Sequence, residues 1–75
     1  MPQAVLTVVP GKQPDLYDAG VLAAEMKLKG RIYDSRPAGS PRGISIILNE
    51  GTSSDDRLKI ANEFKALGYN VIEVP

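Results

Sequence analysis

The residues that most often carry acid–base, nucleophilic and metal chemistry are missing from this chain, because it contains no histidine and no cysteine. The commonest general base, the usual transition-metal ligands and any Ser-His or Cys-His nucleophile pair are therefore excluded. The adjacent carboxylates of Asp55 and Asp56 do not replace them, because neighbours on a helix point about 100° apart. We interpret this pair as a helix cap and a complement to the helix dipole. The sequence predicts a protein that is not an enzyme, with no metal site and no cofactor.

Two glycine-containing loops precede predicted helices, and neither has the pattern of a nucleotide-binding loop. Residues 10–14, PGKQP, lack the glycine count and the Lys-Ser/Thr ending of a Walker loop. Residues 50–54, EGTSS, offer N–H groups and hydroxyls of the kind that bind phosphate. Glu50, Asp55 and Asp56 crowd the same position and would repel an anion, so we expect no phosphate site there.

A basic segment, residues 27–42, is the most specific candidate for a binding site. It carries five cations against the single carboxylate of Asp34, although the formal net charge of the whole chain is zero. Such cations bind phosphates, and arginine also makes bidentate bonds with a partner's carboxylates. The candidate partner-binding residues are Lys27, Lys29, Arg31, Tyr33, Arg36 and Arg42.

Three interpretations of the basic segment are open. It is a solvated region whose charges keep an edge strand from pairing with other chains, a site for an acidic protein partner, or a site for nucleic acid. RNA-recognition domains stack bases on aromatic side chains of their two central strands. The predicted central strands here, AVLTVV and ISIILN, hold no aromatic residue, so stacking of that type is not expected.

The elements before the hairpin follow from hydrophobic periodicity and turn residues. Residues 4–9 predict a strand that ends at Pro10. Residues 14–29 predict a helix with a buried stripe and a stop at Gly30. Residues 31–35 alternate polar and apolar side chains and predict a short edge strand.

The second half of the chain has the clearest pattern. Residues 37–41 predict a loose hairpin loop, and residues 44–48 a central strand. Ser53 with Asp56 three residues later resembles a capping box and predicts the start of a second helix. Gly68 predicts its end, and residues 70–74 the last strand. The apolar face of this helix is predicted from Ile60, Ala61, Phe64 and Leu67.

This order predicts an α+β, ferredoxin-like βαββαβ fold over residues 1–75, a single domain with a four-stranded antiparallel sheet and two helices on one face. Right-handed crossovers place the first and third strands in the centre and the others at the edges. The alternative is a three-stranded βαβαβ sheet in which residues 31–42 are irregular. No apolar run is long enough to span a membrane, and no secretory signal pattern is present, so a cytoplasmic location is expected.

The second face of the sheet is predicted to be open. Alternation places Val5, Thr7 and Val9 on one face of the first strand and Leu6 and Val8 on the other. Whichever set meets the helices, the other leaves apolar side chains uncovered in a monomer, and a contiguous patch of this type commonly marks an interface. We expect a small non-catalytic protein-binding or regulatory module that forms a homodimer through its sheet, with nucleic-acid binding by residues 27–42 as the alternative.

Residues 7–30, TVVPGKQPDLYDAGVLAAEMKLKG, resemble the strand-turn-helix opening of ACT domains. These are small ferredoxin-like modules that bind amino acids and pair side by side. Asp15 stands where those modules usually carry a glycine after the proline. The resemblance covers about a third of the chain and implies a second alternative function, a regulatory module that senses a small ligand.

Overall fold

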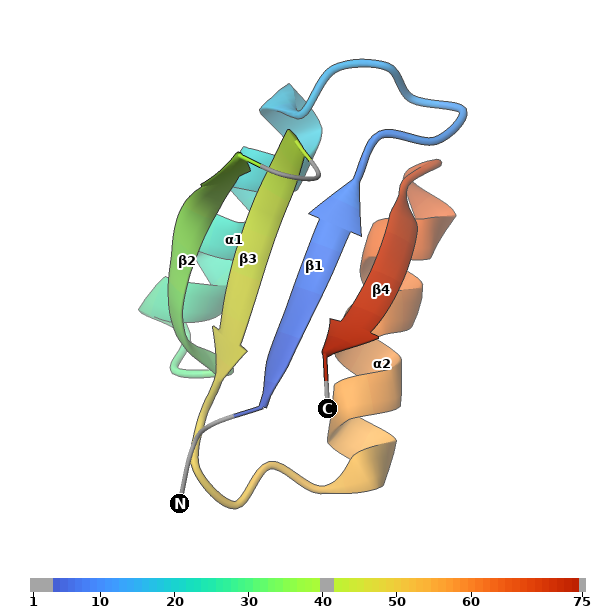
Figure 1. Cartoon of the computed structure of the whole chain (residues 1–75). Helices are drawn as coiled ribbons and strands as arrows, with labels where there is room; N and C mark the ends of the chain where they lie inside the picture. Colours follow the sequence, from blue (N-terminus) through green and yellow to red (C-terminus); the bar gives the residue numbers. More distant parts are fainter. Residues whose placement is uncertain (1–3, 40–41, 75) are drawn as a thin grey trace.

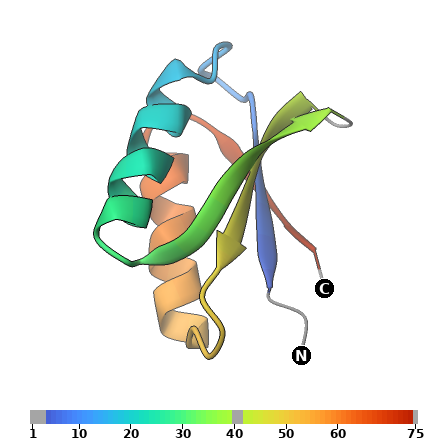
Figure 2. The same ribbon diagram turned by 90° about the vertical axis from the view of Figure 1, so that its left-hand side faces the viewer.

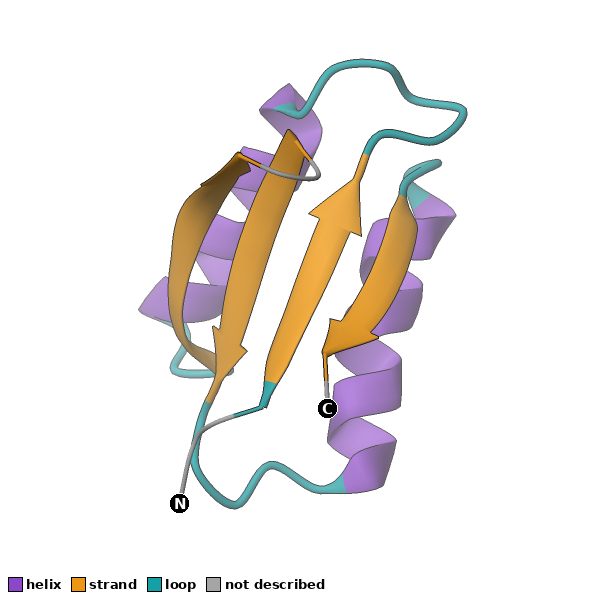
Figure 3. Cartoon of the chain, in the orientation of Figure 1, coloured by secondary structure: helices purple, strands orange, loops and turns teal. Residues whose placement is uncertain are grey.

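Residues 4–39 and 42–74 are described by a computed structural model (Figure 1). Period-two runs of β-branched residues form strands, and the two segments with three-to-four-residue apolar spacing form helices. The elements in chain order are β1 (Val5–Val9), α1 (Tyr17–Leu28), β2 (Ile32–Gly39), β3 (Arg42–Leu48), α2 (Ser54–Ala66) and β4 (Asn70–Val74). The loops gather at the two ends of the sheet (Figure 3).

The four strands form one antiparallel sheet in the order β2-β3-β1-β4. Both helices lie on the same face of this sheet, and the other face is uncovered (Figure 2). The α+β, ferredoxin-like βαββαβ fold is therefore confirmed, with β1 and β3 in the centre. The three-stranded alternative was wrong, because residues 32–39 pair with β3 with a single irregularity at Tyr33.

The second strand is longer than the sequence predicted. The expected edge strand ended at residue 35, but β2 continues to Gly39, which pairs with Arg42. Pro37 lies inside this strand opposite Ile44. A proline is tolerated there because β2 is an edge strand, where a missing N–H on the outer side removes no ladder hydrogen bond. Of the predicted hairpin loop 37–41, residues 37–39 are strand and residues 40–41 lie outside the described part.

Helix α1 begins at Tyr17, three residues later than predicted. The Asp15 carboxylate accepts a hydrogen bond from the Tyr17 N–H at 3.0 Å, which holds the chain in a turn before the helix. The predicted stop is confirmed, because Gly30 has φ 74°, a left-handed conformation that favours glycine.

Helix α2 follows the prediction closely at both ends. The Ser53 hydroxyl accepts a hydrogen bond from the Asp56 N–H at 3.1 Å, and Gly68 has φ 100°. Ile60, Ala61 and Phe64 are buried as expected. Leu67 is not, since it follows the last helical turn and 42% of it is exposed.

The core lies between the helices and one face of the sheet. The sheet contributes Leu6 and Val8 from β1 and Ile46 and Leu48 from β3, none more than 1% exposed. The helices contribute Ala19, Ala23, Met26, Ile60, Ala61 and Phe64. The predicted alternation along β1 and β3 is confirmed, because the residues between these core positions point to the uncovered face.

Candidate protein-binding surfaces

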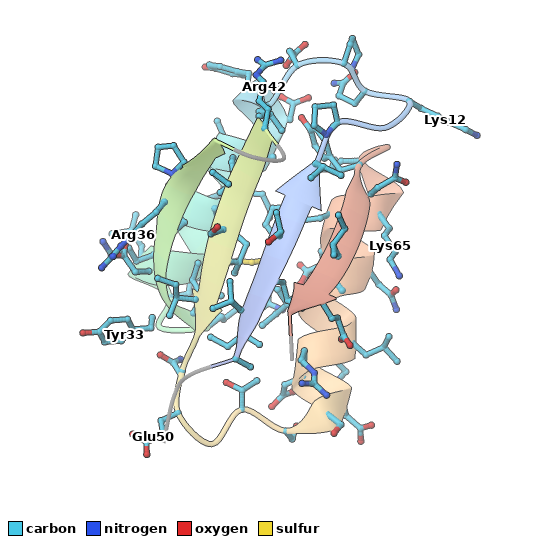
Figure 4. All side chains as sticks on the ribbon, in the orientation of Figure 1. Lys12, Tyr33, Arg36, Arg42, Glu50 and Lys65 are labelled. Atoms are coloured by element: carbon cyan, nitrogen blue, oxygen red, sulfur yellow. The ribbon has the colours of Figure 1, made fainter. Side chains whose placement is uncertain are left out.

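The basic segment is spread along the β2 edge of the molecule. Lys27 lies in the last turn of α1, Lys29 caps it, and Arg31 follows in the turn to β2. Tyr33 and Arg36 project from β2, and Arg42 lies at the far end of the hairpin (Figure 4). The structure thus does not bring the six candidate residues into one cluster.

Arg31 is committed to a partner within the chain. Its Nη1 donates to Glu63 Oε1 on α2 at 3.0 Å, and its Nη2 donates to the second carboxylate oxygen. This bidentate pair holds the pKa of Glu63 below its ordinary value, because the hydrogen bonds from Arg31 favour the ionised carboxylate, although partial burial opposes the shift. The bridge ties the turn between α1 and β2 to the second helix. Arg31 therefore stabilises the fold, and its guanidinium is already occupied by Glu63 when a partner approaches.

Asp34 neutralises part of the remaining charge. Lys27 Nζ lies 3.0 Å from Asp34 Oδ1, and Arg36 Nε lies 3.4 Å from Asp34 Oδ2. The hydrogen bond from Lys27, followed by that from the Ser35 N–H, lowers the pKa of Asp34. The group stays ionised at neutral pH and holds the two cations along the β2 edge.

The β2 edge is poorly suited to pairing with another strand. Its register shifts between Ile32 and Asp34, so that Tyr33, which is 58% exposed, is an irregular position within the strand. Pro37 offers no N–H, and Arg36 is exposed. Irregularity, proline and charge are the features by which proteins block an edge strand. What remains available to a partner on this edge is the strip formed by Lys29, Tyr33, Arg36 and Arg42, which we call the hairpin strip.

On the uncovered face, β3, β1 and β4 carry no ionisable side chain among the residues described, whereas β2 adds Asp34 and Arg36, which pair with Ile47 and Ser45, at its margin. Thr7 in the middle pairs with Ser45 on one side and Ile72 on the other, and Val5 pairs with Ile47. Thr7 is only 8% exposed because these neighbours flank it, whereas Ile72 is 47% exposed. We call this surface the open face. It consists of Val5, Thr7, Val9, Gly43, Ser45, Ile47, Asn70 and Ile72.

The exposure of two apolar side chains near the β4 edge was not predicted from the sequence. Ile72 is at the margin of the open face, and Leu58 on α2 is 56% exposed. The alternation of NVIEV gives a signal for Ile72, because Val71 packs against the core and its neighbour must then point away. For Leu58 the helical spacing gives the signal, since it lies off the face that buries Ile60, Ala61 and Phe64.

Several hollows lie on the described surface, and one of about 310 Å³ is lined by Lys12, Tyr69 and Asn70 among others. One of about 250 Å³ lies between Arg31, Asn49 and Asp56, and another of about 240 Å³ between Leu16, Gly20 and Pro37. Asp34 and Glu63, whose carboxylates have lowered pKa values, are both in surface ion pairs. Within the described ranges, no group of three or more acidic side chains is positioned to hold a metal ion.

Neither helix in the part of the chain that the structure describes has the length and apolar character needed to cross a membrane. No protein-family model, curated protein or solved structure matches the chain.

Proposed function

We propose that this chain is a small, non-catalytic, cytoplasmic protein-binding module that self-associates through its sheet and offers the hairpin strip to an acidic partner. The observation that carries the proposal is the open face: three neighbouring strands present apolar and uncharged polar side chains without an ionisable group among those described. Asp34 and Arg36 of β2 add one charge of each sign at the margin of this face, whereas its centre is uncharged and can meet a second copy of itself without repulsion.

The size of the chain supports self-association. A domain of 75 residues buries a smaller share of its apolar surface than a larger domain does. A second copy placed against the sheet would add to that burial. The open face has a flat footprint of roughly 240 Å², from three strands about 4.8 Å apart and five residues of about 3.3 Å each. This is far below the roughly 800 Å² that each partner contributes to a stable interface, so the face alone predicts weak association.

The hairpin strip supports the second part of the proposal. Lys29 and Arg42 make no ion pair with the described residues, and Arg36 makes a long one. Tyr33 adds an exposed aromatic ring of the kind that is enriched in protein interfaces. Three of the five cations, Lys27, Arg31 and Arg36, are already paired with carboxylates. Such neutralisation favours a few specific carboxylate contacts over a continuous phosphate-binding track.

Sedimentation velocity tests the self-association. We expect the weight-average sedimentation coefficient to rise between about 1 and 100 μM, the range expected for a small interface. Ile72→Lys should raise the dissociation constant at least tenfold, because it places a charge where an apolar side chain is covered. Leu28→Lys is the matched control, since Leu28 is 88% exposed on α1 and lies away from the sheet. A clean monomer over the whole range would refute self-association.

The acidic partner is tested separately with a polyglutamate peptide as the probe. Binding is expected to weaken when Arg36→Ala and Arg42→Ala are combined, and to remain when Lys12→Ala is introduced in the loop after β1. Equal binding of the peptide by both variants, or no binding by the wild-type chain, would refute the claim that the hairpin strip binds an acidic partner.

A further inference from the structure

The two edges of the sheet differ in how well they are blocked. β2 has a register shift, a proline and charged side chains, as described above. β4 pairs with β1 in unbroken register from Asn70 to Val74, and it contains no proline. Its one charged residue, Glu73, is held by Arg57 of α2 at 3.5 Å. The outer side of β4 is thus a regular, unpaired edge of the type that adds a further strand.

The sequence of β4 is compatible with pairing to itself. In an antiparallel pair centred on Ile72, that residue faces Ile72 of the second copy. Val71 then faces Glu73, and Asn70 faces Val74. No two like charges stand directly opposite one another in this register. An apolar pair at the centre would also cover the Ile72 side chain, which is 47% exposed in the single chain.

Helix α2 provides a complementary second layer. Arg57 contacts Glu73 of β4, whereas Glu63 contacts Arg31 on the opposite side, so the two flanks of the helix are identified. Leu58 and Lys65, seven residues apart, lie toward the β4 flank by helical spacing. Figure 4 shows Lys65 on this side of the molecule.

Two such helices would run antiparallel across the pair. Asp55, in the acidic first turn of α2, would then lie near the basic last turn of the other copy, with Lys65, whereas Asp56 lies on the flank that faces Arg31. Antiparallel helix dipoles and opposite charges both favour this arrangement. The exposed Leu58 side chains would lie in the seam between the helices.

We propose that β4 is the self-association edge: a second copy of this chain pairs with it antiparallel, centred on Ile72, to give one continuous eight-stranded sheet with all helices on one face. The proposal rests on the self-association proposed above and specifies its geometry. It also addresses the small size of the open face, because edge pairing adds backbone hydrogen bonds and joins two open faces into one surface of about twice the footprint.

Single introduced cysteines test the geometry, since the chain has none of its own. Directly opposite residues of an antiparallel pair have Cα atoms about 4.5–5.5 Å apart, within the range of a disulfide. Ile72→Cys should therefore give at least about tenfold more disulfide-linked dimer under mild oxidation than Leu28→Cys, which reports random collisions. Asn70→Cys should stay near that background, because its two copies would be about 13 Å apart along the strands.

Further variants separate an edge pair from a face-to-face pair. Leu58→Lys should weaken sedimentation-detected dimers about tenfold if the α2 helices meet, and should leave a face-to-face dimer unchanged. Ile47→Cys, on the open face of β3 and away from the β4 edge, should cross-link only in the face-to-face arrangement.

The outcomes are distinct. A dimer that cross-links through Ile47→Cys, or one in which Ile72→Cys stays at background, overturns the β4 edge and leaves self-association standing. A chain that sediments as a monomer throughout, with no cross-linking above background, overturns both proposals.

Discussion

Gly43 is the position at which the smallest chemical change should have the clearest effect on the sheet. It lies buried in β3, next to the end of β1. A Cβ atom at this position would overlap the Val8 carbonyl oxygen and approach Val9 Cγ1 to 3.1 Å. The first contact is with backbone, which cannot rotate aside as a side chain can. Gly43→Ala should therefore force the two central strands apart at this end.

The expected cost is that of overpacking a well-packed site, about 1–3 kcal/mol of unfolding free energy. A chain of 75 residues is expected to have a total stability of about 4–11 kcal/mol. Each kcal/mol shifts the melting temperature of a domain of this size by about 4–8 °C. A drop of about 5–20 °C in melting temperature is therefore expected for Gly43→Ala.

Gly20→Ala is the matched control, because it makes the same chemical change where no atom lies within 4 Å of the new Cβ. Gly20 is inside α1, so alanine should stabilise the chain by about 0.5–1 kcal/mol. Urea denaturation followed by far-UV circular dichroism measures both variants. A Gly43→Ala variant as stable as the wild type would refute the close approach of β1 and β3 on which the central sheet depends.

Four further outcomes are expected. Phe64→Ala should cost about 3–5 kcal/mol in urea denaturation, since its side chain is fully buried between α2 and the sheet. The pKa values of Asp34 and Glu63 are lowered in the folded chain, so the stability that these carboxylates contribute is present above their ordinary pKa values and is lost as the pH falls through their folded-state pKa values. Glu63→Gln should therefore reduce the loss of melting temperature at acidic pH. An unchanged acid limb of the melting-temperature profile would contradict the ion pair between Arg31 and Glu63. Nucleic-acid binding, if it occurs, should weaken on combining Arg36→Ala with Arg42→Ala, and no anisotropy change with DNA or RNA at low salt would eliminate it. A ligand-sensing module should gain melting temperature with an amino acid, and no shift across a panel of amino acids would count against that alternative.

The topology could be predicted because its signals are local. The capping serine before α2, the glycines after each helix and the alternation in β1 and β3 are all set by neighbours within about four residues. The order of elements then allows few topologies, because each strand-helix-strand crossover is expected to be right-handed. The four-strand prediction depended on residues 31–35, where alternation alone indicated a strand.

The length of β2 could not be predicted from local signals. Pro37 and Gly39 favour turns in isolation, and only the pairing of β2 with the full length of β3 keeps them extended. The ion pairing within the basic segment, residues 27–42, could not be predicted for the same reason. Arg31 and its partner Glu63 are 32 residues apart in sequence, so no local pattern shows that this cation is already neutralised.

The charges of the hairpin and the free edge of β4 are connected by one physical constraint. A four-stranded open sheet has two edges, and each must be blocked or used. Lys27, Asp34 and Arg36 form ion pairs along β2, next to its irregular register and Pro37, so this edge resists a further strand. β4 has a single ion pair, between Glu73 and Arg57, and neither a register shift nor a proline, so we expect its exposed Ile72 to favour the addition of a strand. The proposed self-association is therefore expected at β4, while the charges of β2 remain available for the proposed acidic partner.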